Sequence, residues 1–444
     1  MSLVRRKGLR AEGGHGLNRR EFLHTGLAGL AAITALRLRA AEEPAPKKRP
    51  MAAAFDEEIE AFMAARKVPG GALAVVKDGR LVYACGYGWA NWERRISVKP
   101  DALFRIASLS KPFTAAAVLK LVEEKKLGLE SRAFDIVKLK PLLKADVKPD
   151  ARLAGITVRQ LLQHTGGWDR EKSFDPMFRP AIIARAVGEA GPARPQAVIR
   201  YMLGQPLDFD PGTRFAYSNF GYCVLGRVIE KVTGQSYEKF VQEKILAPIG
   251  IKRMRLGASL DGKQADGEVR YYTPKDETAA NVFPVSPRKV PWPYGGFHLE
   301  AMDAHGGWIA SAIDLARFAA ALADASHRPL LRPETLKTMY APPPPPVSRE
   351  DDGSLKDYYY GCGWMVRPVT KEGKANYWHA GSLPGTSTLL VRRWDGLSWA
   401  VLFNQRSEEK NLPDGAIDGA LHRAAEAVEK WPLEDLFAKW QFDR

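Results

Sequence analysis

A serine and a lysine three residues apart, Ser108 and Lys111, are the pair in this chain best placed for covalent chemistry. The stretch that follows them, 112–124, is rich in helix formers, and side chains three residues apart lie on one face of a helix. Serine is a weak nucleophile at neutral pH because its hydroxyl keeps its proton, so a nearby amine or phenolate must accept it. The N–H groups at the helix start would favour developing negative charge. Ser-x-x-Lys alone is common by chance, so its surroundings decide its meaning.

Two segments further along the chain carry side chains that suit the same chemistry. One is a Tyr-x-Asn with Tyr217 and Asn219, and the other is a His-x-Gly with His379 and Gly381. A positioned tyrosine or histidine can move a proton in a reaction of this kind. Taken singly, each residue has a structural alternative. Tyr217 would be a packed aromatic residue before a helix, Asn219 a helix N-cap, and His379 a structural histidine.

The sequence around these positions resembles the β-lactamase-related serine hydrolases. This family includes serine β-lactamases of the cephalosporinase type, D-Ala-D-Ala carboxypeptidases, D-aminopeptidases and related esterases. The segments that carry the resemblance are FRIASLSKPFTA at 104–115, FAYSNFGY at 215–222 and WHAGS at 378–382. The third segment is similar to the strand motif written Lys-Thr-Gly in β-lactamases and His-x-Gly in several relatives. The resemblance spans about 55–405, with the three motifs in the family's order and spacing.

The resemblance implies a catalytic role for each of these polar residues. Ser108 would attack a carbonyl and form an acyl-enzyme, and Lys111 would lower the cost of its deprotonation. Tyr217 would be the general base, its phenolate stabilised by Lys111 and other polar neighbours. A free tyrosine titrates at about 10, so that role requires several units of stabilisation. Asn219 would hydrogen-bond Lys111 or the substrate amide.

The third motif would complete the site on the strand side. By the same resemblance, the backbone N–H groups of Ser108 and Ser382 form the oxyanion hole beside Gly381, where each donor contributes about 3 kcal/mol. His379 would face the pocket and either tune Tyr217 or contact the substrate.

His379 is also the main departure from true β-lactamases, in which a lysine supplies fixed positive charge for the substrate carboxylate. A histidine with a pKa of about 6.5 is mostly neutral at pH 7.5, so we expect little penicillin hydrolysis. The expected function is an exported serine hydrolase that acts on an ester or a D-amino-acid-containing peptide or amide. The alternative is a catalytically idle, penicillin-binding-like binding or scaffold protein of the cell envelope.

The elements that must position these residues follow from hydrophobic patterning. Apolar residues at helical spacing predict a helix over 55–66, and two β-branched runs joined by Asp78-Gly79 predict a hairpin. Most of 110–322 is helical in pattern, apart from a long structured loop at 263–299. Strands and a closing helix are predicted at the other end: 361–368, 376–379, 386–392, 398–404 and 417–428. The fold class is α+β, β-lactamase/transpeptidase-like, with an antiparallel sheet built from both chain ends, flanking helices and a mostly helical inserted lobe.

The chain divides into four predicted parts. These are a signal peptide at 1–40, a linker at 41–50, a hydrolase domain at 51–430 and a C-terminal tail at 431–444. Within the hydrolase domain, an α/β lobe comprises 51–105 and 355–430, and a helical lobe comprises 106–354.

The first forty residues have the layout of a twin-arginine export signal. Arg19 and Arg20 precede Phe22-Leu23 and the weakly apolar segment 26–36. That segment is shorter than the roughly twenty residues of a spanning helix, so no stable transmembrane anchor is expected. We therefore expect export to the periplasm or the extracellular space, with cleavage near residue 40 or 41.

Composition narrows the possible partners. The formal charge is +15, of which 1–40 holds a large share, and no basic stripe with interleaved aromatics suggests a nucleic-acid partner. Cys85, Cys223 and Cys362 make no C-x-x-C, and the eight histidines show no metal-binding spacing, so no metal or cofactor is indicated. A small-molecule or peptidoglycan-related substrate is expected. The oligomeric state and any cysteine pairing are left open.

Overall fold

The computed structural model describes residues 48–143, 148–284, 288–323, 330–370 and 373–440. The predicted signal peptide lies outside these ranges, as does most of the predicted linker. The end of the linker is docked, because the backbone N–H of Arg49 donates to the Ala427 carbonyl at 2.9 Å. The tail contributes a 3₁₀ helix, Leu436–Trp440, which packs on strand β2.

An antiparallel sheet of eight strands forms the centre of the molecule, in the order β3-β2-β1-β13-β12-β11-β10-β9. The strands at the N-terminal end are β1 (Gly70–Lys77), β2 (Arg80–Asn91) and β3 (Ile96–Ser97). Those at the C-terminal end are β9 (Tyr359–Tyr360), β10 (Met365–Pro368), β11 (Ala375–Leu383), β12 (Thr386–Arg392) and β13 (Leu397–Phe403). Strand β1 pairs with β13 with Leu73 opposite Val401, so the sheet is built from both chain ends as predicted.

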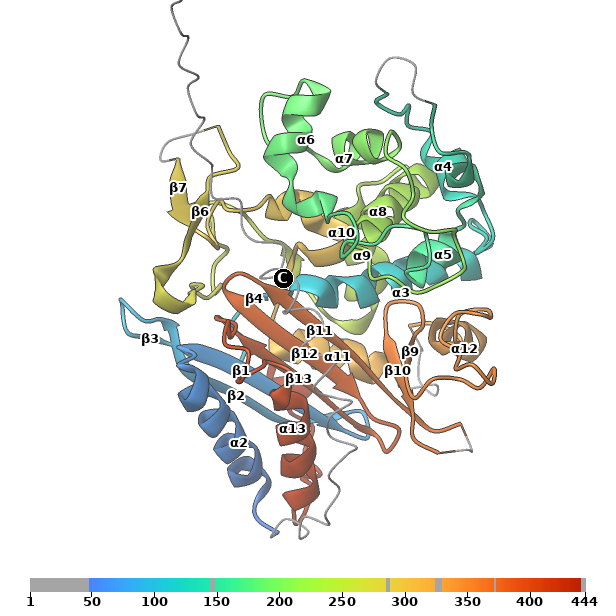
Figure 1. The fold of residues 1–444 in the computed structure, drawn as a ribbon. Helices are drawn as coiled ribbons and strands as arrows, with labels where there is room; N and C mark the ends of the chain where they lie inside the picture. Colours follow the sequence, from blue (N-terminus) through green and yellow to red (C-terminus); the bar gives the residue numbers. More distant parts are fainter. Residues whose placement is uncertain (1–47, 144–147, 285–287, 324–329, 371–372, 441–444) are drawn as a thin grey trace, which may run out of the picture.

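Local sequence explains the first hairpin. Asp78 and Gly79 both have positive φ, 51° and 79°, as a tight two-residue turn between twisted strands requires. Helices α2 (Met51–Arg66) and α13 (Ala416–Ala427) pack together on one face of the sheet (Figure 1). Their apolar side chains and the strand residues on that face form one buried cluster that includes Phe55 and Trp399.

The other face carries α11 (Ala312–Ala321) and, beyond it, the helical region (Figure 1). The predicted capping box opens α11: the Ser311 side chain accepts from the backbone N–H of Asp314, and the Asp314 side chain accepts from that of Ser311. The remaining helices are α3 (Ser110–Glu123), α4 (Ala133–Val137), α5 (Val158–Leu162), α6 (Pro180–Val187), α7 (Pro195–Met202), α8 (Asn219–Thr233), α9 (Tyr237–Val241), α10 (Asp303–Gly306) and α12 (Pro333–Tyr340). Because α11 contacts β1 and β13, it packs with the sheet although it lies within 106–354.

Two small sheets stand outside the predicted pattern. Strands β4 (Phe104–Arg105), β8 (Trp308–Ala310) and β5 (Arg255–Leu256) form a three-stranded sheet beside the start of α3. The predicted loop at 263–299 is largely irregular, but it contains the two-stranded pair β6 (Thr278–Ala280) and β7 (Lys289–Pro291). Strands of two or three residues are too short to show an alternating pattern.

The three cysteines are free thiols, and burial raises the pKa of each of them. Cys223 and Cys362 are fully buried, as small apolar residues would be. Among the helices of the described ranges, none is both long and apolar enough to cross a bilayer.

Candidate active site

Ser108 lies in a 3₁₀ turn, Ala107–Leu109, that runs directly into α3. The preceding residue, Ala107, has a φ of 48°, a left-handed conformation that a non-glycine residue adopts only when its surroundings hold it there. Threonines of β12 supply part of that hold. Thr386 Oγ1 donates to the Arg105 carbonyl at 2.9 Å, and Thr388 Oγ1 donates to the Ile106 carbonyl at 3.1 Å. The sheet thus fixes the backbone that presents Ser108.

The neighbouring serine, Ser110, has a different environment. Its side chain is fully buried, and its hydroxyl donates to the Ala107 carbonyl at 2.7 Å. Ser108 is partly exposed instead. Of these two serines, only Ser108 is placed to meet a substrate.

Lys111 is fully buried, and its ammonium nitrogen has three close oxygen neighbours. Nζ lies 3.1 Å from Ser108 Oγ, 2.8 Å from Asn219 Oδ1 and 2.9 Å from the His305 carbonyl oxygen. The amide and carbonyl oxygens can only accept hydrogen bonds, whereas the hydroxyl can also donate. A neutral amine could therefore keep its two donor bonds and accept one from Ser108.

Burial favours that neutral form. It lowers the pKa of Lys111 well below its usual value, an effect that the charge of Arg170 reinforces and that of Asp175 opposes. The pair thus has a nucleophile and a base of perturbed pKa at 3.1 Å, the arrangement needed for proton transfer out of the serine.

Asn219 is the first residue of α8, and Ser218 rather than Asn219 is the helix N-cap. The Asn219 amide is held at both ends. Its oxygen accepts from Lys111, and its Nδ2 donates to Asp175 Oδ2 at 2.6 Å. Asp175 thereby fixes which end of the amide faces the lysine.

Tyr217 lies against the same lysine, with Lys111 Nζ 4.7 Å from its ring centre. Its hydroxyl is buried and makes no hydrogen bond of good geometry to any residue that the structure describes. Burial raises the pKa of Tyr217 above its usual value, and the nearby Ser108 hydroxyl and Arg170 charge oppose this only in part. Burial thus favours the protonated phenol of Tyr217, whereas the family resemblance implied a stabilised phenolate.

His379 lies on β11 near Tyr217, with their ring centres 6.4 Å apart. Its Nδ1 lies 2.7 Å from the Ala380 carbonyl oxygen, which can only accept, so Nδ1 carries the proton. Nε2 then accepts from the Tyr360 hydroxyl at 2.9 Å. Burial lowers the pKa of His379 to about 3, and Lys111, when protonated, adds to this effect.

Gly381 and Ser382, the other residues of the third motif with an assigned role, lie beside Ser108. A side chain at Gly381 would place its Cβ 2.4 Å from the Ile106 carbonyl and 3.1 Å from the Ser108 nitrogen, so only glycine allows this approach. Ser382 follows it on β11 and is exposed at this edge. The oxyanion role of Ser108 and Ser382 N–H groups stays a prediction.

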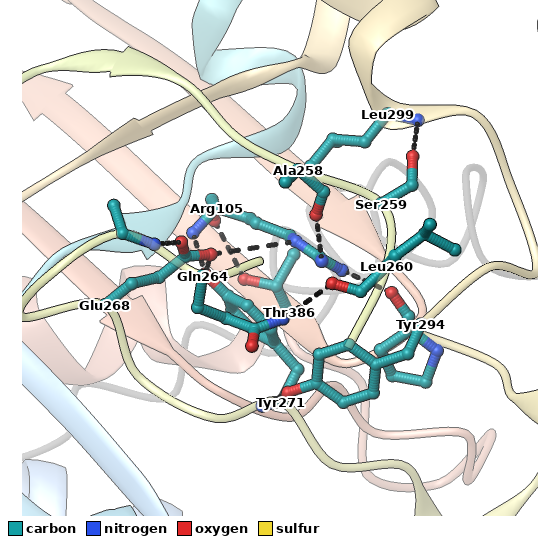
Figure 2. Close-up of polar contacts among 12 residues, drawn as sticks. Arg105, Ala258, Ser259, Leu260, Gln264, Glu268, Tyr271, Tyr294, Leu299 and Thr386 are labelled. Carbon is teal, nitrogen blue, oxygen red and sulfur yellow. Dashed lines mark hydrogen bonds and ion pairs between the residues drawn. The ribbon is translucent and has the colours of Figure 1, made fainter. Parts of the chain in front are cut away.

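A buried arginine ties the 258–300 segment to the strand leading into Ser108. Figure 2 shows the Arg105 guanidinium enclosed by Ala258, Glu268, Tyr271 and Tyr294. Arg105 donates to the Pro293 carbonyl at 2.6 Å and to the Ala258 carbonyl at 2.8 Å, and its Nε lies 4.0 Å from Glu268. Burial raises the pKa of Glu268, while Arg105 opposes that rise. This contact fixes the end of β4, three residues before Ser108.

Comparison with known proteins shows the family to which this chain belongs. The Beta-lactamase family profile matches residues 55–424. The chain belongs to the beta-lactamase family. Penicillin-binding protein 4* of Bacillus subtilis strain 168 is 24% identical over 366 residues, which are 79% of this chain and 71% of that protein.

Two solved structures share the fold at lower identity. The D-amino acid amidase from Ochrobactrum anthropi SV3, complexed with L-phenylalanine amide, has a TM-score of 0.63 and 22% identity over 85% of this chain and 98% of that one. EstCE1, a hydrolase with promiscuous acyltransferase activity, has a TM-score of 0.64 and 18% identity over 85% and 98%.

The structure brings all seven residues predicted from the beta-lactamase-family motifs to one region of the fold, where Ser108, Lys111 and Asn219 are in direct contact. It adds Asp175 and Tyr360, to which the sequence assigned no role. Asp175 stands in a loop, 44 residues before the amide it binds. No spacing rule could have found it. No cluster of three or more potential metal ligands occurs within the described ranges.

Proposed function

We propose that this protein is a serine hydrolase that cleaves an ester or a D-amino-acid-containing amide or peptide through an acyl-enzyme on Ser108. The contact between Ser108 Oγ and the buried Lys111 Nζ carries this proposal. An idle binding protein would not need to keep a lysine in a fully buried position with a lowered pKa.

Acylation would begin with proton transfer from the Ser108 hydroxyl to the neutral Lys111 amine. The oxygen then bonds to the carbonyl carbon, and the carbonyl oxygen becomes an oxyanion near the Ser108 and Ser382 N–H groups. When the tetrahedral species collapses, the bond to the leaving alcohol or amine breaks and that group takes a proton. Water repeats the sequence on the acyl-enzyme and releases the acid.

Tyr217 fits the second half of this cycle. A phenol of raised pKa holds its proton at neutral pH, so it can give that proton to the leaving group and recover one from Lys111. We therefore assign Lys111 as the first proton acceptor and Tyr217 as the proton donor.

The proposed substrates follow from the site and from related proteins. A carboxylate contact by a protonated His379 is not available, because a pKa of about 3 leaves the imidazole neutral at physiological pH. Efficient penicillin hydrolysis through that contact is not expected. The named activity of the amidase makes amides of D-amino acids the first compounds to try, and a short activated ester tests acylation of Ser108 in general.

A substrate panel tests the proposal directly. Purified protein should hydrolyse p-nitrophenyl butyrate or D-phenylalanine amide, with turnover of benzylpenicillin far slower. Ser108→Ala should reduce every activity to background, while Ser110→Ala should retain a measurable rate. Equal activity of the Ser108→Ala variant and the wild-type protein would refute the assignment.

A further inference from the structure

Arg170 places a permanent positive charge one aromatic ring away from the reacting serine. Its guanidinium carbon lies 5.0 Å from the centre of the Tyr217 ring, and that ring lies 4.7 Å from Lys111 Nζ. The Ser108 hydroxyl is itself close enough to Tyr217 to lower its pKa. A substrate that extends from Ser108 past the Tyr217 ring would approach the Arg170 guanidinium.

The charge of Arg170 is paired with a carboxylate of the protein only through one partly exposed contact among the described residues. Within the described ranges, its one side-chain hydrogen bond runs from Nε to the adjacent Glu171 at 3.3 Å, in a pair whose side chains are 30% and 37% exposed. Exposed pairs of this kind contribute about 0–1 kcal/mol. Neighbouring cations are more firmly bound: Arg214 contacts Asp169 at 2.8 Å, and Lys172 donates to the Asp208 carbonyl at 2.8 Å.

The other basic groups near Ser108 cannot recognise an anion. Both ring nitrogens of His379 are hydrogen-bonded, and the Lys111 amine is fully buried with three close partners. Burial lowers the pKa of His164 and of His305 well below the usual value, so both imidazoles are neutral at pH 7. Within the described ranges Arg406 also reaches the site, where it donates to Ser382 Oγ at 3.4 Å, but its Nε is already paired with Glu408. The permanent cation against the Tyr217 ring is Arg170.

We propose that Arg170 determines specificity by binding an anionic group, such as a carboxylate, close to the scissile carbonyl of the substrate. The inference rests on the proposed function. A guanidinium can hold a carboxylate with two parallel N–H bonds. The hydrogen bond of Arg170 to Glu171 uses only Nε, which leaves its two terminal nitrogens to face a substrate carboxylate. This site would take acidic esters or amides and is separate from the strand position of His379.

A purely electrostatic role is the rival explanation. Arg170 lowers the pKa of both Tyr217 and Lys111, so its loss could slow every substrate alike. That role would shift the pH profile of kcat/KM equally for anionic and neutral substrates. Anion binding would instead change the ratio between the two substrates.

The test uses two esters that differ in one charge: mono-p-nitrophenyl glutarate and its methyl ester. For the wild-type protein, kcat/KM should be higher for the free acid, and the advantage should shrink as salt is added. Arg170→Gln should lower the acid-to-ester ratio of kcat/KM roughly tenfold or more, mainly through KM, as expected for losing a charged hydrogen bond. Arg170→Lys should keep part of the preference.

Two further variants sharpen the outcome. Arg214→Gln, the same substitution on a neighbouring arginine, should leave the ratio unchanged. Glu171→Gln removes the competing carboxylate and should raise it. An unchanged ratio in Arg170→Gln, or a wild-type protein without acid preference, would overturn the inference. If the wild-type protein cleaved neither ester and its serine were not acylated, the proposed function itself would fail, and the role of Arg170 with it.

Discussion

The Lys111 amine has three oxygen neighbours, and two of them can only accept hydrogen bonds. Asn219 Oδ1 and the His305 carbonyl hold the amine in place in either protonation state. The third neighbour, Ser108 Oγ, can reverse its role from acceptor to donor when the amine is neutral. The proton can thus move along an existing contact without rearrangement of the lysine.

The assignment of Lys111 as the base predicts a particular pH profile. A base acts when it is deprotonated, so kcat/KM should rise with pH through the pKa of Lys111, which burial has lowered well below 10.5. A phenolate base would place this rise above pH 10, because the pKa of Tyr217 is raised. Measuring kcat/KM on a neutral ester from pH 5 to 10 distinguishes these two bases. A kcat/KM that rises only at the alkaline end of this range would contradict the assignment of Lys111.

Asp175 is predicted to be a positioning residue. Asp175→Asn removes a negative charge that raises the pKa of Lys111, so the acidic limb should move to lower pH. It also weakens the bond that orients Asn219, and kcat should fall roughly tenfold. Asp210→Asn, an exposed carboxylate paired with Arg152, is the matched control. A lower kcat without movement of the limb would point to a structural role alone.

For individual residues, the sequence identified the side chains predicted to react with the substrate, but it did not identify the side chains that orient them. Ser108 and Lys111 are linked by helical spacing, which a sequence shows directly. The contact of Asp175 with Asn219 joins a loop to helix α8, and that of Tyr360 with His379 joins two strands, so both depend on the folded chain. The raised pKa of Tyr217 likewise follows from burial, which a motif does not report.

Among the elements, the contact between β4 and the 258–300 segment should contribute strongly to stability. Arg105→Leu removes the buried cation that Ala258, Pro293 and Glu268 surround. Breaking a buried pair from one side commonly costs 3–5 kcal/mol, so we expect a loss of about that size in the free energy of unfolding. Urea titration measures it. The exposed Arg152→Leu control should lower the free energy of unfolding far less, because solvent screens the Arg152 ion pairs.

A double variant checks the cause of that loss. Arg105→Leu with Glu268→Leu leaves neither charge buried alone, so its loss should be smaller than the sum of the two single losses. Strict additivity would show that Arg105 and Glu268 act independently.

Elements with long, regular patterns were predictable, and the shortest ones were not. The helix at 55–66, the Asp78-Gly79 hairpin, three of the four predicted C-terminal strands and the closing helix appear in the structure. Of the strand predicted at 361–368, only Met365–Pro368 is a strand. Strands β4, β5 and β8 have two or three residues each and exist only because they pair with one another. Their formation depends on tertiary contact, which local sequence does not encode.

For the whole molecule, pairing of the first and last strands means that the sheet is complete only when the entire chain has been made. We propose that the twin-arginine segment directs the protein to the periplasm or beyond. Replacing Arg19 and Arg20 by lysines should leave the protein in the cytoplasm with its signal uncleaved. Cell fractionation and the mass of the exported protein measure this, and unchanged export would exclude the twin-arginine route.

The central claim is that the whole fold serves to present one reactive serine. Treating the native protein with a fluorophosphonate and sequencing its peptides by mass spectrometry tests this claim most directly. We expect a single adduct on Ser108, absent from Ser108→Ala and strongly reduced in Lys111→Met. The buried Ser110 should stay unlabelled because its hydroxyl is bonded to the Ala107 carbonyl. An adduct on Ser110 or on another residue, or none on Ser108, would contradict the account.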